Sequence, residues 1–124
     1  MVRGNKMAIP EEIKKELECC GGLSGLGKNL DSEQDLKKVA NIFNALSDSK
    51  RIKILEIVDI QPVCVCVIKE MLRIPDSKLS YHLNVLKEAG LVVAKQKKKF
   101  LFYQPTKLGK DTLKMIKKHY LVSK

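Results

Sequence analysis

The sequence predicts a mainly α-helical protein that carries a single β-hairpin. Apolar residues recur three or four positions apart through most of the chain, which is the period of a helix with one buried face. Near the C-terminus, two short apolar runs at residues 91–94 and 100–104 flank a lysine-rich turn at 95–99 and predict the hairpin. The 124 residues suffice for one modest core, and chains of this size often gain stability as oligomers.

The first predicted helix has clear boundaries at both ends. It begins at Pro10, because the fixed φ of proline suits the first turn of a helix. It ends at Cys20, because the two glycines that follow favour helix termination. The glycine- and serine-rich stretch from Gly22 to Asn29 is predicted to be a loop.

Three further helices are expected in the middle of the chain. Ser32 opens a pattern that resembles a capping box, and apolar residues at helical spacing follow it. The pair Ser47-Asp48 is expected to cap the next helix. The chain then breaks at Pro62, and a short helix runs from about Cys64 to Leu72.

The helix after Pro75 is expected to have an apolar and a polar face. Asp76 or Ser77 would cap it, and Gly90 would end it. After the hairpin, Thr106 opens the last helix. Three leucines are predicted to face the core from the helix after Pro75: Leu79, Leu83 and Leu86.

A short helix, a turn, a second helix and a hairpin, in this order, predict a winged helix-turn-helix. In that arrangement the second helix enters the major groove of DNA and the hairpin lies along the phosphates. We therefore expect three parts with a helical dimer interface. These are an N-terminal arm and helix with a cysteine pair (residues 1–30), a winged helix-turn-helix core (31–106) and a C-terminal dimerisation helix (107–124).

The net charge of +10 is concentrated in the C-terminal part of the chain. Residues 73–124 contain 13 lysines and arginines against three acidic residues, whereas residues 1–72 contain 11 of each. One strongly basic face favours a polyanion such as DNA as partner. From charge alone, a solvated lysine-rich surface and an anionic membrane surface remain as alternatives.

The outward face of the second helix and the lysines of the turn would contact DNA. Hydroxyls and an amide can pair with base edges, whereas lysines reach guanine or phosphate. For each position, an ordinary solvated side chain is the alternative. His82, beside Leu83, is predicted to be a packed structural histidine rather than a ligand. The candidates for DNA contact are Ser77, Lys78, Ser80, Tyr81, Asn84 and Lys87 on the helix, and Lys95, Lys97, Lys98 and Lys99 on the turn.

Four cysteines occur in two tight groups, Cys19-Cys20 and Cys64-Val65-Cys66. Clustered thiols in a reducing compartment indicate soft-metal binding or redox chemistry. The second group lies at a helix start, whose positive end favours thiolate. Because positions two apart in a regular helix point away from each other, one ion can bridge both sulfurs only if the first turn is irregular. The alternative is that Cys20 and Cys64 are small buried hydrophobic residues.

Four stretches of the chain follow a known pattern: residues 45–55, the ligand motif Cys64-Val65-Cys66, residues 79–92 and residues 100–103. Through them, roughly residues 36–105 resemble the ArsR/SmtB family of metal-responsive repressors. The resemblance implies a homodimer that represses operons for metal or metalloid resistance and leaves double-stranded operator DNA when its inducer binds. The chain departs from the family pattern at Lys69, where some relatives have another cysteine, and at Val67, where an acidic residue often follows the motif.

The resemblance also implies how the thiol site is completed. In such relatives an N-terminal arm joins the Cys-Val-Cys helix, often across the dimer, so Cys19 and Cys20 are the expected partners. Three thiolates suit As(III) or Sb(III), which we expect first, and four would suit cadmium, lead or zinc. A thiol redox switch of the same fold is the other alternative. The family's second metal site is not expected, because Asp111 and His119 do not match its spacing.

The apolar stripes of the first and last helices are expected to form the dimer interface. An enzyme is not expected, because no nucleophile–histidine arrangement and no phosphate-binding loop is found. A DNA-binding protein without a small ligand remains a third class. The sequence suggests no secretory signal and no membrane partner, so we expect a cytoplasmic location. The expected interface residues are Ile13, Leu17, Leu113, Ile116 and Tyr120.

Overall fold

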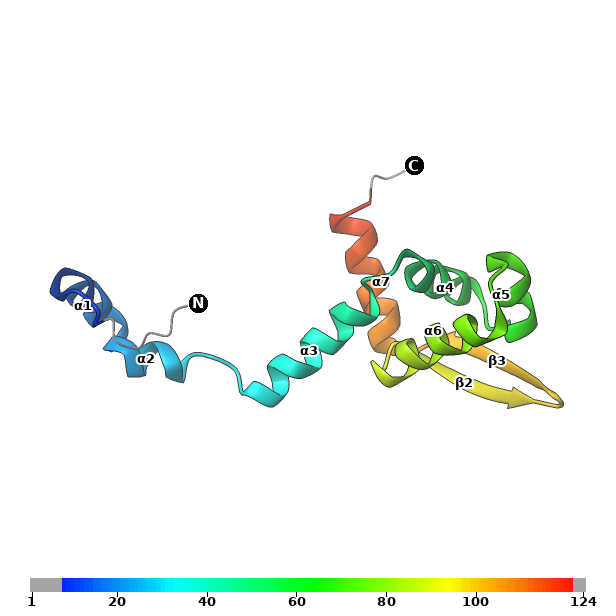
Figure 1. Ribbon diagram of the computed structural model, residues 1–124, viewed down its shortest axis with the longest axis horizontal. Coiled ribbons are helices and arrows are strands. Elements are labelled where there is room, and N and C mark those ends of the chain that lie inside the picture. Colours follow the sequence, from blue (N-terminus) through cyan, green and yellow to red (C-terminus); the bar gives the residue numbers. More distant parts are fainter. Residues whose placement is uncertain (1–7, 122–124) are drawn as a thin grey trace. The chain divides into compact units, whose positions relative to one another are not determined.

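The computed structural model describes residues 8–121, apart from the side chain of Cys20. The chain forms two compact units, one ending at Leu36 and the other beginning at Lys37 (Figure 1). Within the described residues, every helix is too short or too polar to traverse a lipid bilayer.

The N-terminal unit consists of short helical segments joined at a glycine. Helix α1 (Glu11–Leu17) continues into a 3₁₀ turn, η1 (Glu18–Cys20), which ends at the predicted residue. Gly21 follows with a φ of 84°, a left-handed conformation that favours glycine. The loop predicted after it is wrong, because helix α2 (Gly22–Lys28) forms there. The side-chain amide of Asn29 donates to a carbonyl oxygen of this helix at 3.1 Å, which offsets the low helix propensity of its glycines.

The C-terminal unit contains the remaining helices, and the predicted order of its helices and hairpin is confirmed. The first turn of α3 still belongs to the N-terminal unit. The helices are α3 (Glu33–Ala45), α4 (Ser49–Ile60), α5 (Val65–Leu72), α6 (Asp76–Glu88) and α7 (Lys107–His119).

Side-chain oxygens cap three of these helices and fix where they begin. The cap predicted for α6 is wrong, because Pro75 takes the N-cap position and makes no side-chain hydrogen bond. Asp76 instead lies in the first turn, where its negative charge interacts favourably with the positive end of the helix dipole. The capping oxygens accept from backbone N–H groups in the pairs Ser32 with Asp35 (3.1 Å), Asp48 with Lys50 (2.8 Å) and Thr106 with Gly109 (3.0 Å).

Three antiparallel strands form a small sheet in the order β1-β3-β2. Strands β2 (Val92–Lys97) and β3 (Phe100–Pro105) form the predicted hairpin, which we call the wing (Figure 1). Because β2 continues to Lys97, the turn is shorter than predicted. Strand β1 (Val63–Cys64) escapes sequence prediction, because two residues are too few to show a strand period.

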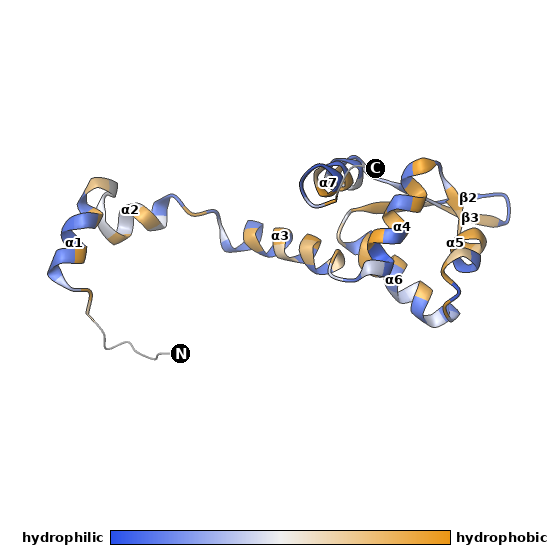
Figure 2. Ribbon diagram, turned by 90° about the horizontal axis from the view of Figure 1, so that it is seen from above, coloured by the Kyte–Doolittle hydropathy of each residue, from blue (hydrophilic) through white to orange (hydrophobic). Residues whose placement is uncertain are grey.

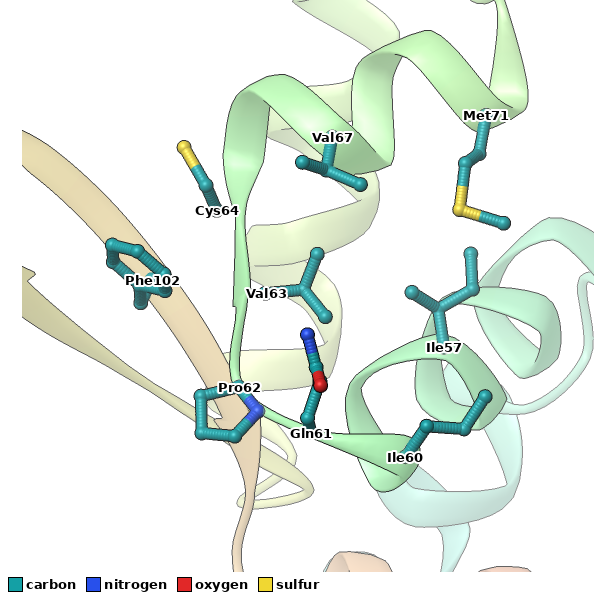
Figure 3. Close-up of a pocket in the computed structure, with 9 residues that line it drawn as sticks. All are labelled: Ile57, Ile60, Gln61, Pro62, Val63, Cys64, Val67, Met71 and Phe102. Atoms are coloured by element: carbon teal, nitrogen blue, oxygen red, sulfur yellow. The ribbon is translucent and has the colours of Figure 1, made fainter.

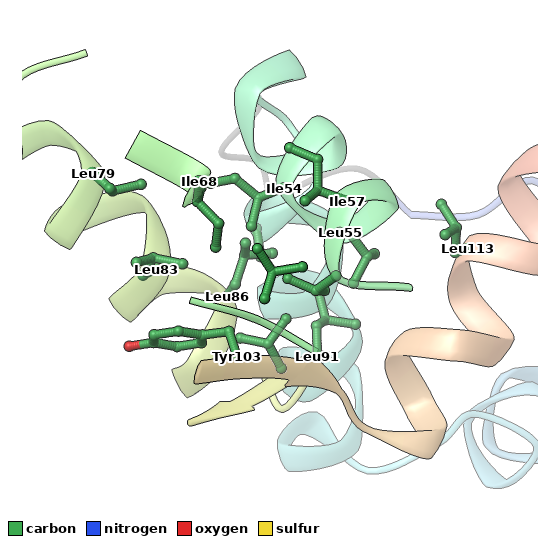
Figure 4. Close-up of a cluster of buried hydrophobic side chains, with 14 residues drawn as sticks. Ile54, Leu55, Ile57, Ile68, Leu79, Leu83, Leu86, Leu91, Tyr103 and Leu113 are labelled. Carbon is green, nitrogen blue, oxygen red and sulfur yellow. The ribbon is translucent and has the colours of Figure 1, made fainter. Parts of the chain in front are cut away.

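The core of the C-terminal unit is built from apolar side chains of all its helices and strands (Figure 4). The predicted inward face of α6 is confirmed, since its three leucines are at most 4% exposed. Besides these, the core contains Ala45, Ile54, Leu55, Ile57, Val58, Val63, Ile68, Leu91, Val92, Tyr103 and Leu113.

Helix α7 packs tightly against the segment between α6 and β2. Gly109 lies so close to Leu91 that a methyl group in place of its hydrogen would overlap the Leu91 carbonyl oxygen. The backbone N–H of Thr106 donates to the same oxygen at 3.0 Å. The missing side chain and this hydrogen bond together fix the start of α7.

Candidate functional site

One face of α6 and the tip of the wing are polar and exposed, whereas the opposite face of α6 is buried in the core. Figure 2 shows the hydrophilic tip of the wing. Hydroxyls, an amide and lysines on these two elements can contact base edges and phosphates. All ten residues predicted to contact DNA are exposed: Ser77, Lys78, Ser80, Tyr81, Asn84, Lys87, Lys95, Lys97, Lys98 and Lys99.

Two wing lysines are held in defined positions. The Lys97 ammonium lies 5.5 Å from the centroid of the Phe102 ring, a cation–π distance. Lys98 has a φ of 59°, in the left-handed region that turns usually fill with glycine or asparagine. A lysine in this unfavourable conformation places a charge at the outermost point of the wing.

Arg51, which was not among the residues predicted from the sequence, holds α6 to the end of α3. Its Nε donates to the Ala45 carbonyl oxygen at 2.8 Å and its Nη2 to that of Asn44 at 3.3 Å. Its Nη1 lies 3.0 Å from Nδ1 of His82. Burial lowers the pKa of His82, so the neutral ring accepts this hydrogen bond. No local pattern marks Arg51, because its partners lie in other elements.

Cys64 and Cys66 lie side by side where β1 passes into α5. Cys64 is the N-cap of α5 with extended backbone (φ −67°, ψ 144°), whereas Cys66 lies in the first helical turn. The junction therefore has the irregularity that a shared ligand requires, and the two sulfurs are 2.7 Å apart. Cys64 is partly exposed and Cys66 is exposed, so neither is a buried hydrophobic residue.

The two thiols differ in acidity. Hydrogen bonds from the Cys66 thiol and then from the Cys66 backbone N–H lower the pKa of Cys64. The same bond between the thiols raises the pKa of Cys66, because the donating thiol keeps its proton. Cys64 is therefore the more readily ionised sulfur of the pair.

An apolar pocket of about 390 Å³ adjoins Cys64 (Figure 3). Three of the side chains that line it are exposed although they are apolar, Ile60 by 82%, Val67 by 45% and Met71 by 59%. Phe102 of the wing lines the pocket on the side of Cys64. Clustered exposed apolar side chains of this kind often mark a binding surface.

The cysteine pair is connected to both elements that carry the predicted DNA contacts. Cys64 is paired with Phe102 of β3, so its strand belongs to the same sheet as the wing. Helix α5 carries Lys69, whose Nζ lies 2.7 Å from Oδ1 of Asp76 at the start of α6. A change of angle between β1 and α5 would therefore act on both elements.

Comparison with known proteins assigns the chain to a family. Residues 48–93 match the family described as bacterial regulatory protein, arsR family. The arsenical resistance operon repressor of Bacillus subtilis is 38% identical over 69 residues, which are 55% of this chain and 66% of that protein. A Halobacterium salinarum protein named "Putative arsenical resistance operon repressor ArsR" is 36% identical over 101 residues, 80% of this chain and 75% of that protein. The chain belongs to the ArsR family.

Solved structures agree with this assignment at the level of the fold. HlyU from Vibrio cholerae aligns with a TM-score of 0.65 at 23% identity and covers 73% of this chain and 100% of its own. The ArsR-family chain is a winged helix-turn-helix DNA-binding transcriptional regulator and not an enzyme. Helix α6 holds the position of the recognition helix in this fold, and α5 is the helix before it.

The other predicted ligands of this ArsR-family regulator, Cys19 and Cys20, belong to its N-terminal unit. The exposed Cys19 donates from its thiol to a backbone carbonyl oxygen at 3.3 Å, and the side chain of Cys20 lies outside the described residues. In the described part of the C-terminal unit, no third His, Cys, Asp or Glu joins Cys64 and Cys66 into a metal-binding group.

The residues predicted for the dimer interface differ in what they expose. Leu113 and Ile116 are 1% and 8% exposed, because they pack within their own unit, and they have little surface left for a partner. Tyr120 and Ile13 are exposed by 72% and 43%, and Leu17 is partly buried. The ArsR-family regulator thus offers less of the predicted stripe than its sequence suggests.

Proposed function

We propose that this protein is a homodimeric repressor that binds a palindromic operator and leaves it when a soft metal(loid) binds Cys64 and Cys66. As(III) or Sb(III) is the first choice of inducer, with cadmium, lead or zinc as alternatives. The observation that carries the proposal is the 2.7 Å separation of the two sulfurs at the junction of the wing sheet and α5. The names of the arsenical-resistance relatives support the same class of inducer.

The donor set fits a soft ion. Thiolates bind soft metals and metalloids preferentially. Because the pKa of Cys64 is lowered, this sulfur is the one of the pair that ionises more readily to the thiolate. Cys66 would lose its proton on binding, so affinity should rise with pH. Inorganic As(III) accepts three sulfurs, and we propose Cys19 or Cys20 as the third ligand.

Ligand binding and DNA release are coupled because the two sulfurs belong to different elements. When Cys64 of β1 and Cys66 of α5 hold one ligand, the strand and the helix are fixed at one angle. The strand is part of the wing sheet, and the ion pair of Lys69 with Asp76 passes a shift of α5 to α6. Release requires tighter ligand binding in the DNA-free state. A coupling of about 1–3 kcal/mol changes DNA affinity about 5- to 150-fold.

We propose a dimer interface between α3 and α7. A groove of about 400 Å³ there is lined by apolar side chains that include Phe43, Leu46, Met115 and Tyr120. Phe43 is 53% exposed and Tyr120 72%, an unfavourable exposure that a second copy would remove. Phe43→Glu with Tyr120→Glu should sediment as a monomer, whereas the control Ile60→Glu, at an exposed site outside the groove, should remain a dimer. A dimeric double variant would rule out this groove.

The wing is proposed to bind phosphates. Replacement of Lys97, Lys98 and Lys99 by Ala should weaken binding to all duplexes alike. The slope of log affinity against log salt should become shallower by up to about 5, since the dimer loses the contacts of three lysines on each of its two wings and each phosphate contact contributes about 0.9. A variant with full affinity and an unchanged salt slope would exclude the wing from the interface.

The central experiment is a titration of the reduced protein on DNA. A fluorescent duplex selected from a random pool by the protein itself is followed by anisotropy while arsenite, antimonite, cadmium, lead or zinc is added. Arsenite or antimonite should release the duplex, and Cys64→Ser with Cys66→Ser should bind DNA but ignore the ion. A full response of this double variant would refute the assignment of the inducer to Cys64 and Cys66.

A thiol redox switch is the second candidate, and the adjacent sulfurs with unequal acidity favour it. The same titration separates the two functions. If hydrogen peroxide releases the duplex and none of the ions does, the redox switch replaces the ion sensor.

A further inference from the structure

We propose that the pocket beside Cys64 receives the organic substituent of a trivalent arsenical that carries one carbon group, R–As(OH)₂, with R an aryl ring. Cys64 and Cys66 bind its arsenic. The inference rests on the proposed function, since it names a ligand class for the same two thiols.

An arsenic atom that is already bonded to carbon needs two sulfurs rather than three. Its two As–O bonds break, two As–S bonds form, and the two thiol protons leave with the two hydroxides as water. Arsenic stays trivalent, so the exchange requires no oxidant or reductant. Cys64 and Cys66, with sulfurs 2.7 Å apart, supply both bonds without Cys19 or Cys20.

The third substituent on arsenic would then meet an apolar surface. Figure 3 shows Cys64 at the edge of the pocket beside Phe102, with Val67, Met71 and Ile60 further around it. The volume of about 390 Å³ is within the range of small-molecule sites, about 300–1,000 Å³.

The lining favours an aryl group over a methyl group. Phe102 can pack against a ring edge or face, and the Met71 sulfur makes favourable contacts with aromatic rings. An aryl group would also cover part of the exposed surface of Ile60, Val67 and Met71, which a methyl group is too small to do. Arsenite has no group to place there and gains nothing from the pocket.

The test compares phenylarsonous acid, methylarsonous acid and arsenite on the full-length reduced protein. Adduct formation is followed by mass spectrometry in competition with a small dithiol, and DNA release by anisotropy. The phenyl compound should bind at least tenfold more tightly than the methyl compound. Cys19→Ser with Cys20→Ser should weaken arsenite binding and leave phenyl binding unchanged.

Two pocket variants and one control locate the aryl group. Ile60→Asn with Met71→Asn removes apolar surface and Val67→Trp fills space; each should weaken phenyl binding about fivefold or more and leave arsenite binding unchanged. Leu108→Asn, at a 41% exposed position on α7, should change neither. Equal affinity for phenyl and methyl compounds, or equal effects of the variants on phenyl compound and arsenite, would refute the pocket. Failure of all three arsenicals to bind would instead refute As(III) as the inducer in the proposed function, on which this inference rests.

Discussion

The two helices of the helix-turn-helix are held in very different ways. Helix α6 buries three leucines and also His82, whose ring is bonded to Arg51. Helix α5 buries only Ile68, and its Val67 and Met71 side chains are exposed. The helix that would enter the groove is thus firmly held, and the helix with the cysteine pair is lightly held. Recognition requires fixed geometry, whereas a sensing element must be able to move.

The strongest test of this difference compares one substitution in each helix. Leu83→Ala in α6 should lower the free energy of unfolding by about 2–4 kcal/mol, because it leaves a cavity in the core. Val67→Ala in α5 should lower it by about 0.5 kcal/mol or less, because its side chain is exposed. Urea unfolding measures both, and similar losses would mean that α5 is as firmly held as α6.

Removal of Arg51 should loosen α6 without creating a cavity in the leucine core. Arg51→Ala leaves the carbonyl oxygens of Asn44 and Ala45 and the Nδ1 of His82 without their donor. We expect a loss of about 1–3 kcal/mol in unfolding free energy and weaker DNA binding. Lys50→Ala, at the neighbouring exposed position, is the control and should change stability little. An unaffected Arg51→Ala protein would show that α6 does not depend on this anchor.

Stability should also fall in acid through His82. Burial lowers its pKa in the folded protein below the unfolded value of about 6.5. The contribution of the neutral ring to the free energy of unfolding is therefore complete above pH 6.5. It is lost as the pH falls through the lowered pKa of His82 in the folded protein. Unfolding in urea between pH 7.5 and 5 should show this loss, and His82→Asn, which can still accept from Arg51, should reduce it. If the free energy of unfolding of His82→Asn depends on pH as that of the parent protein does, the loss of stability in acid comes from other groups.

The smallest expected effect on stability comes from breaking the ion pair of Lys69 with Asp76, which links α5 to α6. The ion pair of Lys69 with Asp76 is exposed, so Lys69→Ala should change the unfolding free energy by less than about 0.5 kcal/mol. If the pair transmits the shift of α5, the ratio of DNA affinities without and with arsenite should fall about two- to threefold. The same ratio in variant and parent would mean that transmission runs through the wing sheet alone.

Sequence patterns correctly predicted the helices whose boundaries and buried faces are determined by residues within or next to the helix. The leucine spacing of α6 gave its buried face, and the capping residues Asp48 and Thr106 marked where α4 and α7 begin. Helix α2 was missed, because glycine favours loops and its C-terminal hydrogen bond comes from a residue beyond the helix.

The candidate site could be predicted only in part for the same reason. The sequence pairs Cys64 with Cys66 but does not show that Cys64 lies in a strand, because β1 exists only through pairing with distant β3. Arg51 and the pocket likewise depend on contacts between elements far apart in the chain. Exposure of the predicted DNA-contact residues on α6 followed from helix geometry, and exposure of the wing lysines from their position in a charged hairpin turn. Contact of both groups with DNA stays a prediction.

Gly109 affects the distance between the two α6 helices of a dimer, and therefore the spacing of the DNA half-sites that the dimer can bind. In a dimer built on α7, the separation of the two α6 helices depends on how α7 meets the segment after α6. Gly109 and the hydrogen bond of Thr106 to Leu91 leave this joint no room to slide. The two α6 helices of the dimer would therefore be held at a constant distance, suited to half-sites about one turn of DNA apart, roughly 34 Å. An inducer would then change how firmly each half-site is held and leave their spacing constant.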